Sequence, residues 1–379
     1  MITCRERLLT VLRGGIPDCV PVAPDFSNMI PARLTGKPFW QLYLYRDPPI
    51  WEAYLEAAKK FNIDSVMDGY APLTFPEDSA GQPPKERFIV RRDEQMIVTQ
   101  GSMRENGRRT WDALVDVFYV DNPPTWGVSP DKVGLGPEPK WYEPLEGVKP
   151  VDTGPAGLKR VKELMGDQGL VGVWLTGSCV LGSEEAIYRY YDNPDLHERW
   201  AAQRVEAVER RFAQIMSMEV RPDFLCVGGS GTLVFQTVEI FRQLALPAVK
   251  RGIELATAAG IPTHVHSCGP ETALVKIMAE ETSLTVIDPL EIPPMGDCHL
   301  AELKRLYGKK LTLKGNLHTT KVMLHGRPQD VVAAARKAIE EAAEGGRFIL
   351  STGDQCGRDT PDENLQALVE TARTYGRYA

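Results

Sequence analysis

The feature that most constrains this chain is a short, β-branched run that recurs eight times, ends in glycine, aspartate or another polar residue, and is followed by a helix-like stretch. Eight β units joined by helices are what a (β/α)8 barrel requires. A doubly wound sheet of eight strands would give the same alternation and stays open as an alternative. We therefore predict an α/β fold, a (β/α)8 TIM barrel. The eight runs are residues 19–25, 63–70, 170–177, 224–231, 261–269, 284–291, 311–318 and 348–356.

One stretch departs from this alternation. Residues 84–125 alternate polar and apolar side chains around turn signals, which is typical of antiparallel strands. Residues 126–150 are rich in proline, glycine and tryptophan, and we expect an irregular loop over the barrel mouth. The chain is thus predicted to be a single barrel domain, 1–379, with an insertion at about 71–168 that places an antiparallel sheet between the second and third strands. Near the end, Thr360-Pro361-Asp362-Glu363 predicts a last helix with Thr360 as its N-cap.

Composition excludes several classes of protein. The chain has 379 residues, 44 Lys and Arg against 51 Asp and Glu, and a net charge of −7, so a basic surface for nucleic acid is not expected. No apolar run reaches the roughly 18 residues of a membrane span. The N-terminal segment reads as an amphipathic helix rather than a signal peptide. Seven scattered cysteines, an odd number, do not form a disulfide framework, so we expect a cytoplasmic protein.

The strongest chemical signal is the motif His264-Val-His266-Ser-Cys268-Gly269. Side chains alternate along a strand, so His266 and Cys268 project from the carboxyl end of the fifth predicted strand. Cys356 follows the last predicted strand, at the same face of a barrel, where active sites lie. One imidazole and two thiolates suit zinc, and three protein ligands leave a fourth position for water or substrate. The sequence predicts a catalytic zinc site of His266, Cys268 and Cys356.

Two alternatives to this site stay open. Cys268 and Cys356 can be buried core thiols, with His266 hydrogen-bonded in the core. His264 also competes with His266 for the ligand position. We favour His266 because it is nearer the end of the strand, and we expect His264, one pleat deeper, to support the structure or a ligand.

Four motifs in the C-terminal half carry a resemblance to a known family. They are residues 266–269, 313–317, 346–356 and 359–364. Together they resemble the signature of the uroporphyrinogen decarboxylase superfamily, and more closely its cobalamin-linked methyltransferase branch. The resemblance covers the whole chain and implies a (β/α)8 barrel. It also implies that His266, Cys268 and Cys356 hold zinc.

The N-terminal region departs from the decarboxylase branch. Decarboxylases of the family resemble one another in an arginine-bearing Q-A-G-R-Y-like motif that grips substrate carboxylates, whereas here residues 24–29 read Pro-Asp-Phe-Ser-Asn-Met and Arg33 stands alone. A polycarboxylate substrate needs several cations. We therefore expect a zinc-dependent methyltransferase that moves a methyl group between a small substrate (a methyl ether, a methylated C1 compound or a thiol) and a corrinoid protein. A decarboxylase of a carboxylated substrate is the alternative, and a non-catalytic corrinoid-protein partner is a third hypothesis.

The expected cofactors are Zn²⁺ and a cobalamin carried by a partner protein. A cobalamin domain usually supplies an Asp-x-His-x-x-Gly motif, and Asp195-Leu196-His197 is not followed by the required glycine. A separate corrinoid protein is expected to dock, with residues 126–150 as a candidate contact. Polar residues at the predicted strand ends are candidates for substrate binding. They are Asp25, Asp288, Glu291, Asn316, His318 and Asp354.

Overall fold

The computed structural model describes residues 2–69, 71, 73–79, 85–105, 107–181 and 183–378. The chain divides into two compact units. The first unit consists of Met1–Asp25, Ala58–Ala71 and Leu158–Ala379, and the second of Phe26–Ala57 and Pro72–Gly157. The second unit thus includes residues 26–57, which lie outside the predicted insertion at 71–168, and it ends at Gly157. The description of the chain as a single domain stays a prediction.

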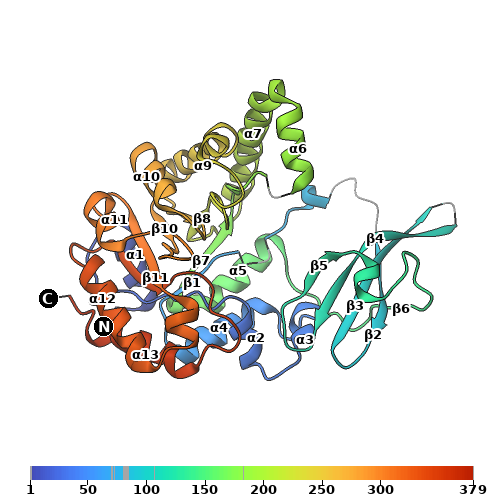
Figure 1. Cartoon of the computed structure of the whole chain (residues 1–379), viewed down its shortest axis with the longest axis horizontal. Helices are drawn as coiled ribbons and strands as arrows, with labels where there is room; N and C mark the ends of the chain where they lie inside the picture. Colours follow the sequence, from blue (N-terminus) through green and yellow to red (C-terminus); the bar gives the residue numbers. More distant parts are fainter. Residues whose placement is uncertain are drawn as a thin grey trace. The chain divides into compact units, whose positions relative to one another are not determined.

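The first unit is built on a parallel sheet whose strands follow one another in chain order (Figure 1). Each strand overlaps one of the predicted runs. The strands are β1 (Ser65–Met67), β7 (Gly169–Trp174), β8 (Phe224–Cys226), β9 (Thr263–His266), β10 (Val286–Asp288), β11 (Thr312–Leu317) and β12 (Phe348–Thr352). Strands β8 to β12 are buried at every position, because a parallel sheet is covered on both faces.

The first predicted run, residues 19–25, closes this sheet. Val22 forms a parallel bridge with Leu350 of β12. The Ala23 amide donates to the Leu350 carbonyl at 2.9 Å, and the Asp64 amide, next to β1, donates to the Val22 carbonyl at 2.8 Å. The run thus lies between the last and the first strand of the sheet, and the predicted barrel with its antiparallel insertion is confirmed.

Helix α1 (Cys4–Leu12) packs at the amino ends of the barrel strands. Its residues Leu8 and Val11 are fully buried in a cluster with side chains from the first or second positions of several strands. This apolar contact covers one end of the barrel. The carboxyl ends of the strands, at the opposite end, remain available for a functional site.

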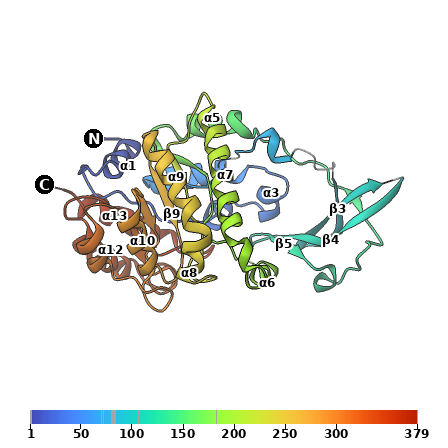
Figure 2. The same ribbon diagram turned by 90° about the horizontal axis from the view of Figure 1, so that it is seen from above.

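The other helices of the barrel unit surround the strands, and α7 and α9 lie side by side (Figures 1 and 2). Each buries one stripe of side chains; α12, for example, buries Val331, Ala335 and Ala338 among others. The helices are α6 (Glu184–Asp192), α7 (His197–Met216), α8 (Val238–Ile240), α9 (Leu246–Ala258), α10 (Thr272–Glu281), α11 (Leu300–Tyr307), α12 (Pro328–Ala342) and α13 (Asp362–Thr374).

The start of α13 differs from the prediction. Its N-cap is Pro361, which makes no side-chain capping bond, so the predicted capping box on Thr360 is wrong. The Thr360 side chain lies beside the Cys356 thiol and lowers the pKa of that thiol. It is thus turned toward the loop before it and not toward the first amides of α13.

The second unit contains the predicted antiparallel sheet, in the order β5-β4-β3-β2-β6. Its two edge strands, β5 and β6, lie almost entirely within residues 126–150, where an irregular loop was predicted, so that prediction is wrong at these positions. Its core packs Phe88, Val98 and Val117 with neighbouring apolar side chains. Its strands are β2 (Glu86–Arg92), β3 (Met96–Glu105), β4 (Arg108–Tyr119), β5 (Thr125–Val128) and β6 (Glu143–Pro144). Two short helices, α2 (Met29–Leu34) and α3 (Phe39–Tyr43), also belong to it, whereas α4 (Ile50–Phe61) and α5 (Gly154–Met165) pass from one unit into the other.

Among the described residues, no helix combines the length and the apolar character needed to cross a bilayer.

Candidate functional site

The candidate site lies at the carboxyl ends of β9 and β10. His266 and Asp288 are the last residues of these two strands and are partners in the parallel register. Because partner residues in neighbouring parallel strands face the same side of the sheet, their side chains meet. The loops after β9, β10 and β12 supply the remaining side chains of the site.

Asp288 is the hub of this cluster. Its Oδ1 is 3.0 Å from Nδ1 of His266 and 2.9 Å from Nε2 of His264, and its Oδ2 accepts a bond from Nζ of Lys314. All four side chains are buried. Burial by itself raises the pKa of Asp288, but the charges of Lys314, His264 and His266 hold this pKa well below its ordinary value. Asp288 is therefore a carboxylate.

This contact fixes the orientation of the His266 ring. A carboxylate accepts hydrogen bonds, so Nδ1 of His266 carries the proton and Nε2 is left for another partner. Nε2 lies 3.7 Å from Oδ1 of Asp354. Burial opposes a charge on His266, but Asp288 raises its pKa well above the ordinary value, as expected for an electron-rich imidazole.

Two groups of potential ligands share Asp354. In one, ligand atoms of Asp25, His266 and Asp354 lie within 4.8 Å of one another, and in the other those of Cys268, Glu291 and Asp354 do. Cys268 also lies close enough to His266 to raise the pKa of its imidazole. Asp354 has a φ of 105°, a conformation that non-glycine residues rarely adopt and that is found at functional sites.

Glu291 shapes the loop that carries Cys268. Its carboxylate accepts the Gly269 amide at 2.6 Å. Burial raises the pKa of Glu291, and the charge of Asp354 adds to this effect. The predicted residues Asp25, His266, Cys268, Asp288, Glu291 and Asp354 are thus brought into one neighbourhood.

Cys356 lies next to this neighbourhood but in neither of the two groups. It is fully buried, and its amide donates to the Asp25 carbonyl at 2.9 Å. Burial raises the pKa of its thiol to about 12, with a further contribution from the charge of Asp25. The ligand set of His266, Cys268 and Cys356 stays a prediction.

The last two candidates, Asn316 and His318, make other contacts. Asn316 donates from Nδ2 to the Leu290 carbonyl at 3.2 Å and so holds the loop after β10. Nδ1 of His318 accepts the amides of Thr320 and Lys321 at 3.3 and 3.2 Å. The His318 ring thus caps the helical turn Thr319–Leu324. A substrate-binding role for either residue stays a prediction.

Sequence reasoning missed two charged residues of this cluster. Lys314 is buried within β11, and its signal is a lysine inside a predicted barrel strand, because a buried lysine is rare unless its charge is paired. Glu271 is fully buried, and its Oε2 accepts the Leu290 amide at 3.0 Å. Burial raises the pKa of Glu271 well above its ordinary value. Its position before α10 gives no sequence signal of burial.

The donors of this cluster suit a zinc ion. They comprise an imidazole nitrogen, thiol sulfurs and carboxylate oxygens, which is the ligand chemistry of zinc. The contact from Asp288 to Nδ1 of His266 is the carboxylate–histidine arrangement that accompanies metal-bound histidines. The residues present therefore fit the ion that the resemblance implies.

Comparison with known protein families gives a match for the part of the chain that contains this site. Residues 213–375 match the family model described as uroporphyrinogen decarboxylase (URO-D). That segment contains β8 to β12 and thus His266, Cys268 and Cys356. Over these residues the chain is similar to the uroporphyrinogen decarboxylase family, as its motifs indicated.

Within that class, curated relatives point to the methyltransferase branch. The chain is 27% identical over 139 residues to the methylcobamide:CoM methyltransferase MtbA of Methanosarcina mazei, which is 36% of this chain and 37% of that protein. It is also 27% identical over 137 residues to MtbA of Methanosarcina acetivorans, with the same shares of the two chains. The matched segment thus spans little more than a third of these relatives.

A solved structure shares the fold of this chain. A methyltransferase from Methanosarcina mazei aligns over 99% of both chains with a TM-score of 0.60 and 17% sequence identity. At this identity the likeness establishes the shared fold. The resemblance to the superfamily and to its methyltransferase branch is confirmed.

Proposed function

We propose that this protein is a zinc-dependent methyltransferase that moves a methyl group between a small substrate and a corrinoid protein. The substrate is a methyl ether, a methylated C1 compound or a thiol. The observation that carries the proposal is the buried Asp288–His266 pair beside Cys268 at the carboxyl end of the barrel. The similarity to methylcobamide:CoM methyltransferases supports it.

His266, Cys268 and Cys356 are proposed to hold the zinc ion, with Asp354 and Glu291 close to the same position. Zinc would keep a substrate thiol deprotonated, or withdraw electrons from a leaving oxygen, at neutral pH. Because burial raises the pKa of the Cys356 thiol, this thiol is protonated without the ion. It would lose its proton on binding zinc.

Other residues of the chain would orient these ligands. Asp288 keeps the proton of His266 on Nδ1 and directs Nε2 to the site. Lys314 keeps Asp288 ionised. Glu291 holds the loop that carries Cys268 through the Gly269 amide. Rigid ligands of this kind hold a substrate in a reactive position and exclude water from it.

The charges around the site favour methyl transfer over the alternative, decarboxylation. Asp25, Asp288, Glu291 and Asp354 gather there, and the cation Lys314 is bonded to Asp288. A carboxylated substrate needs unpaired cations in its pocket. A thiol, an ether or a methylated amine does not. The decarboxylase alternative has the family model in its favour but lacks such cations in this cluster.

The corrinoid is proposed to belong to a partner protein, with residues 126–150 of this chain as a candidate contact. The other proposed partner is the small-molecule methyl donor or acceptor, with neither nucleic acid nor membrane involved. A cytoplasmic location is proposed on the scattered cysteines, none of which forms a disulfide among the described residues.

The test combines metal content with methyl transfer. Wild type and Cys268→Ser are purified without chelators, their zinc is measured by mass spectrometry, and methyl transfer between free cobalamin and thiol, ether or amine substrates is followed in both directions by cobalamin absorbance. We expect Cys268→Ser to lose about one zinc per chain and at least about 100-fold in rate.

The matched control is Cys298→Ser, because Cys298 is also a thiol of the barrel unit, but its sulfur contacts Thr272 and Asp297 and belongs to none of the groups of potential ligands among the described residues. It should keep its zinc and its rate. Unchanged zinc in Cys268→Ser, or release of carbon dioxide from a carboxylated substrate without methyl transfer, would move the decarboxylase alternative to first place.

A further inference from the structure

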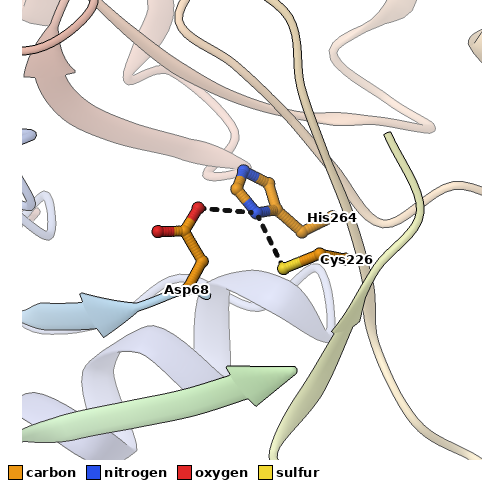
Figure 3. Close-up of side chains that lie close together, drawn as sticks. All are labelled: Asp68, Cys226 and His264. Carbon is orange, nitrogen blue, oxygen red and sulfur yellow. Dashed lines mark hydrogen bonds and ion pairs between the residues drawn. The ribbon is translucent and has the colours of Figure 1, made fainter. Parts of the chain in front are cut away.

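A second group of metal-type ligands lies in the barrel, separate from the Cys268 neighbourhood. Asp68 follows β1, Cys226 ends β8 and His264 stands in β9 (Figure 3). Cys226 and His264 are partners in the parallel register, so their side chains face the same side of the sheet. Figure 3 shows the Asp68 carboxylate and the Cys226 sulfur both directed to the same nitrogen of His264.

The spacing of these atoms is close to that of ligands on one ion. Nδ1 of His264 is 3.5 Å from Oδ2 of Asp68 and 3.9 Å from Sγ of Cys226, and all three ligand atoms lie within 4.8 Å of one another. Ligands about 2.0–2.3 Å from a tetrahedral zinc ion lie roughly 3.3–3.7 Å apart. Shifts of a few tenths of an ångström would bring the three atoms into coordination.

The hydrogen bonds of His264 leave a place for a cation. Its Nε2 is 2.9 Å from the Asp288 carboxylate, and its Nδ1 faces the Asp68 carboxylate. A neutral imidazole has one N–H, so with Nε2 donating to Asp288 the lone pair of Nδ1 points toward a second acceptor. A metal ion between Nδ1 and Asp68 satisfies both groups.

Charge and access agree with this arrangement. A neutral imidazole, a thiolate and a carboxylate around a divalent cation sum to zero, and the neighbouring Lys314–Asp288 pair is also neutral. Cys226 and His264 are buried, whereas the Asp68 side chain is 30% exposed. The exposed side offers a path for the ion and a fourth position for water.

We propose that Asp68, Cys226 and His264 form a second metal site, selective for a borderline divalent ion of the Zn²⁺ type. Asp288 joins it to the proposed His266 site, because its Oδ1 contacts Nε2 of His264 and Nδ1 of His266. His264 thus serves its own ion and does not replace His266. The proposed second site does not depend on the proposed methyl transfer.

Metal titration tests the proposal. The chelator-treated protein is dialysed against Zn²⁺ or Co²⁺, bound metal is counted by mass spectrometry, and cobalt–thiolate absorption is recorded. Wild type should bind about two ions per chain, and Cys226→Ala and Asp68→Asn about one each. Cys268→Ser should also bind about one, and the Cys226→Ala/Cys268→Ser double variant almost none.

Cys298→Ala is the control for loss of a buried thiol, since Cys298 and Cys226 are both almost completely buried. It should bind as many ions as wild type. Asp68→Asn keeps the test informative if Cys226→Ala does not fold, because Asp68 is partly exposed.

The pattern of loss separates this proposal from the proposed function. Binding of about one ion that Cys268→Ser removes and Asp68→Asn does not would overturn the second site and leave the methyltransferase proposal intact. An imidazolium that donates to both carboxylates would then explain the contacts of His264. Binding of about one ion that Asp68→Asn removes and Cys268→Ser does not would support the second site and contradict the first.

Discussion

At the scale of single residues, Asp288 shows how one carboxylate organises a site. It bonds two imidazoles and an ammonium group within the barrel. A buried charge is costly unless it is paired and hydrogen-bonded. Here the Asp288 carboxylate pairs with the Lys314 ammonium group, and both imidazoles hydrogen-bond to the same carboxylate. The orientation of His266, and of His264 two positions earlier, follows from this single side chain.

Replacing Asp288 with asparagine tests this role. Asp288→Asn keeps the shape but leaves the Lys314 ammonium buried without its counter-charge, so we expect a loss of about 3–5 kcal/mol in the free energy of unfolding. Loss of the carboxylate partner of His266 should weaken zinc binding by about 10–100-fold. Urea denaturation and competition with a chelator measure the two effects. Asp297→Asn, which alters a carboxylate that contacts Thr272 instead, should change neither by much.

At the scale of elements, buried charges also join the outer helices to the strands. Asp223, directly before β8, bonds both terminal nitrogens of Arg5 in α1, at 3.0 and 2.5 Å, and Nζ of Lys162 in α5 at 2.8 Å. It also accepts the Val171 amide of β7 at 2.9 Å. One side chain thus ties two helices to two neighbouring strands.

This network predicts a dependence of stability on pH. Burial opposes the charge of Asp223, but the bonds from Arg5 and Lys162 lower its pKa in the folded protein. A folded-state pKa below the unfolded value of about 3.9 stabilises the folded state above that value, and the contribution disappears as the pH falls through the folded pKa.

We therefore expect Asp223→Asn to cost about 1.5–3 kcal/mol at pH 7. The difference from wild type should shrink as the pH falls below about 4. Urea midpoints of both proteins across this range measure it. A difference that stays constant down to the acid transition would contradict the assigned ion pairs.

At the scale of the barrel unit, the scaffold and the site lie at opposite ends of the strands. Helix α1 closes the amino ends, and the Asp288 cluster occupies the carboxyl ends. Cys226 packs in the same apolar cluster as Leu8 and Val11 of α1, whereas His266, Cys268 and Asp288 do not belong to that cluster. Stability and zinc binding at the proposed His266 site should therefore respond to different substitutions.

Leu8→Ala tests this separation. Leu8 is completely buried in the cluster under the barrel, so we expect a loss of about 2–5 kcal/mol in the free energy of unfolding. Zinc binding at the proposed His266 site should not change, because no residue of that site belongs to this cluster. Ile16→Ala, at a side chain that is 56% exposed, should alter stability by no more than about 0.5 kcal/mol. Loss of metal in folded Leu8→Ala would show that the two ends are coupled.

The sequence by itself determined the strands, the inserted antiparallel sheet and the cluster of candidate residues after β9, β10 and β12. These features are local: a strand buried on both faces is a continuous apolar run, and a polar residue at its end marks the carboxyl edge. The motif from His264 to Gly269 was visible for the same reason.

The tertiary structure alone decided which atoms meet. Asp288 contacts Lys314, 26 positions later, and Asp68 contacts His264 across nearly two hundred residues. Such pairs depend on strand register, on the closing of the sheet by residues 19–25 and on side-chain rotamers, none of which a local pattern contains.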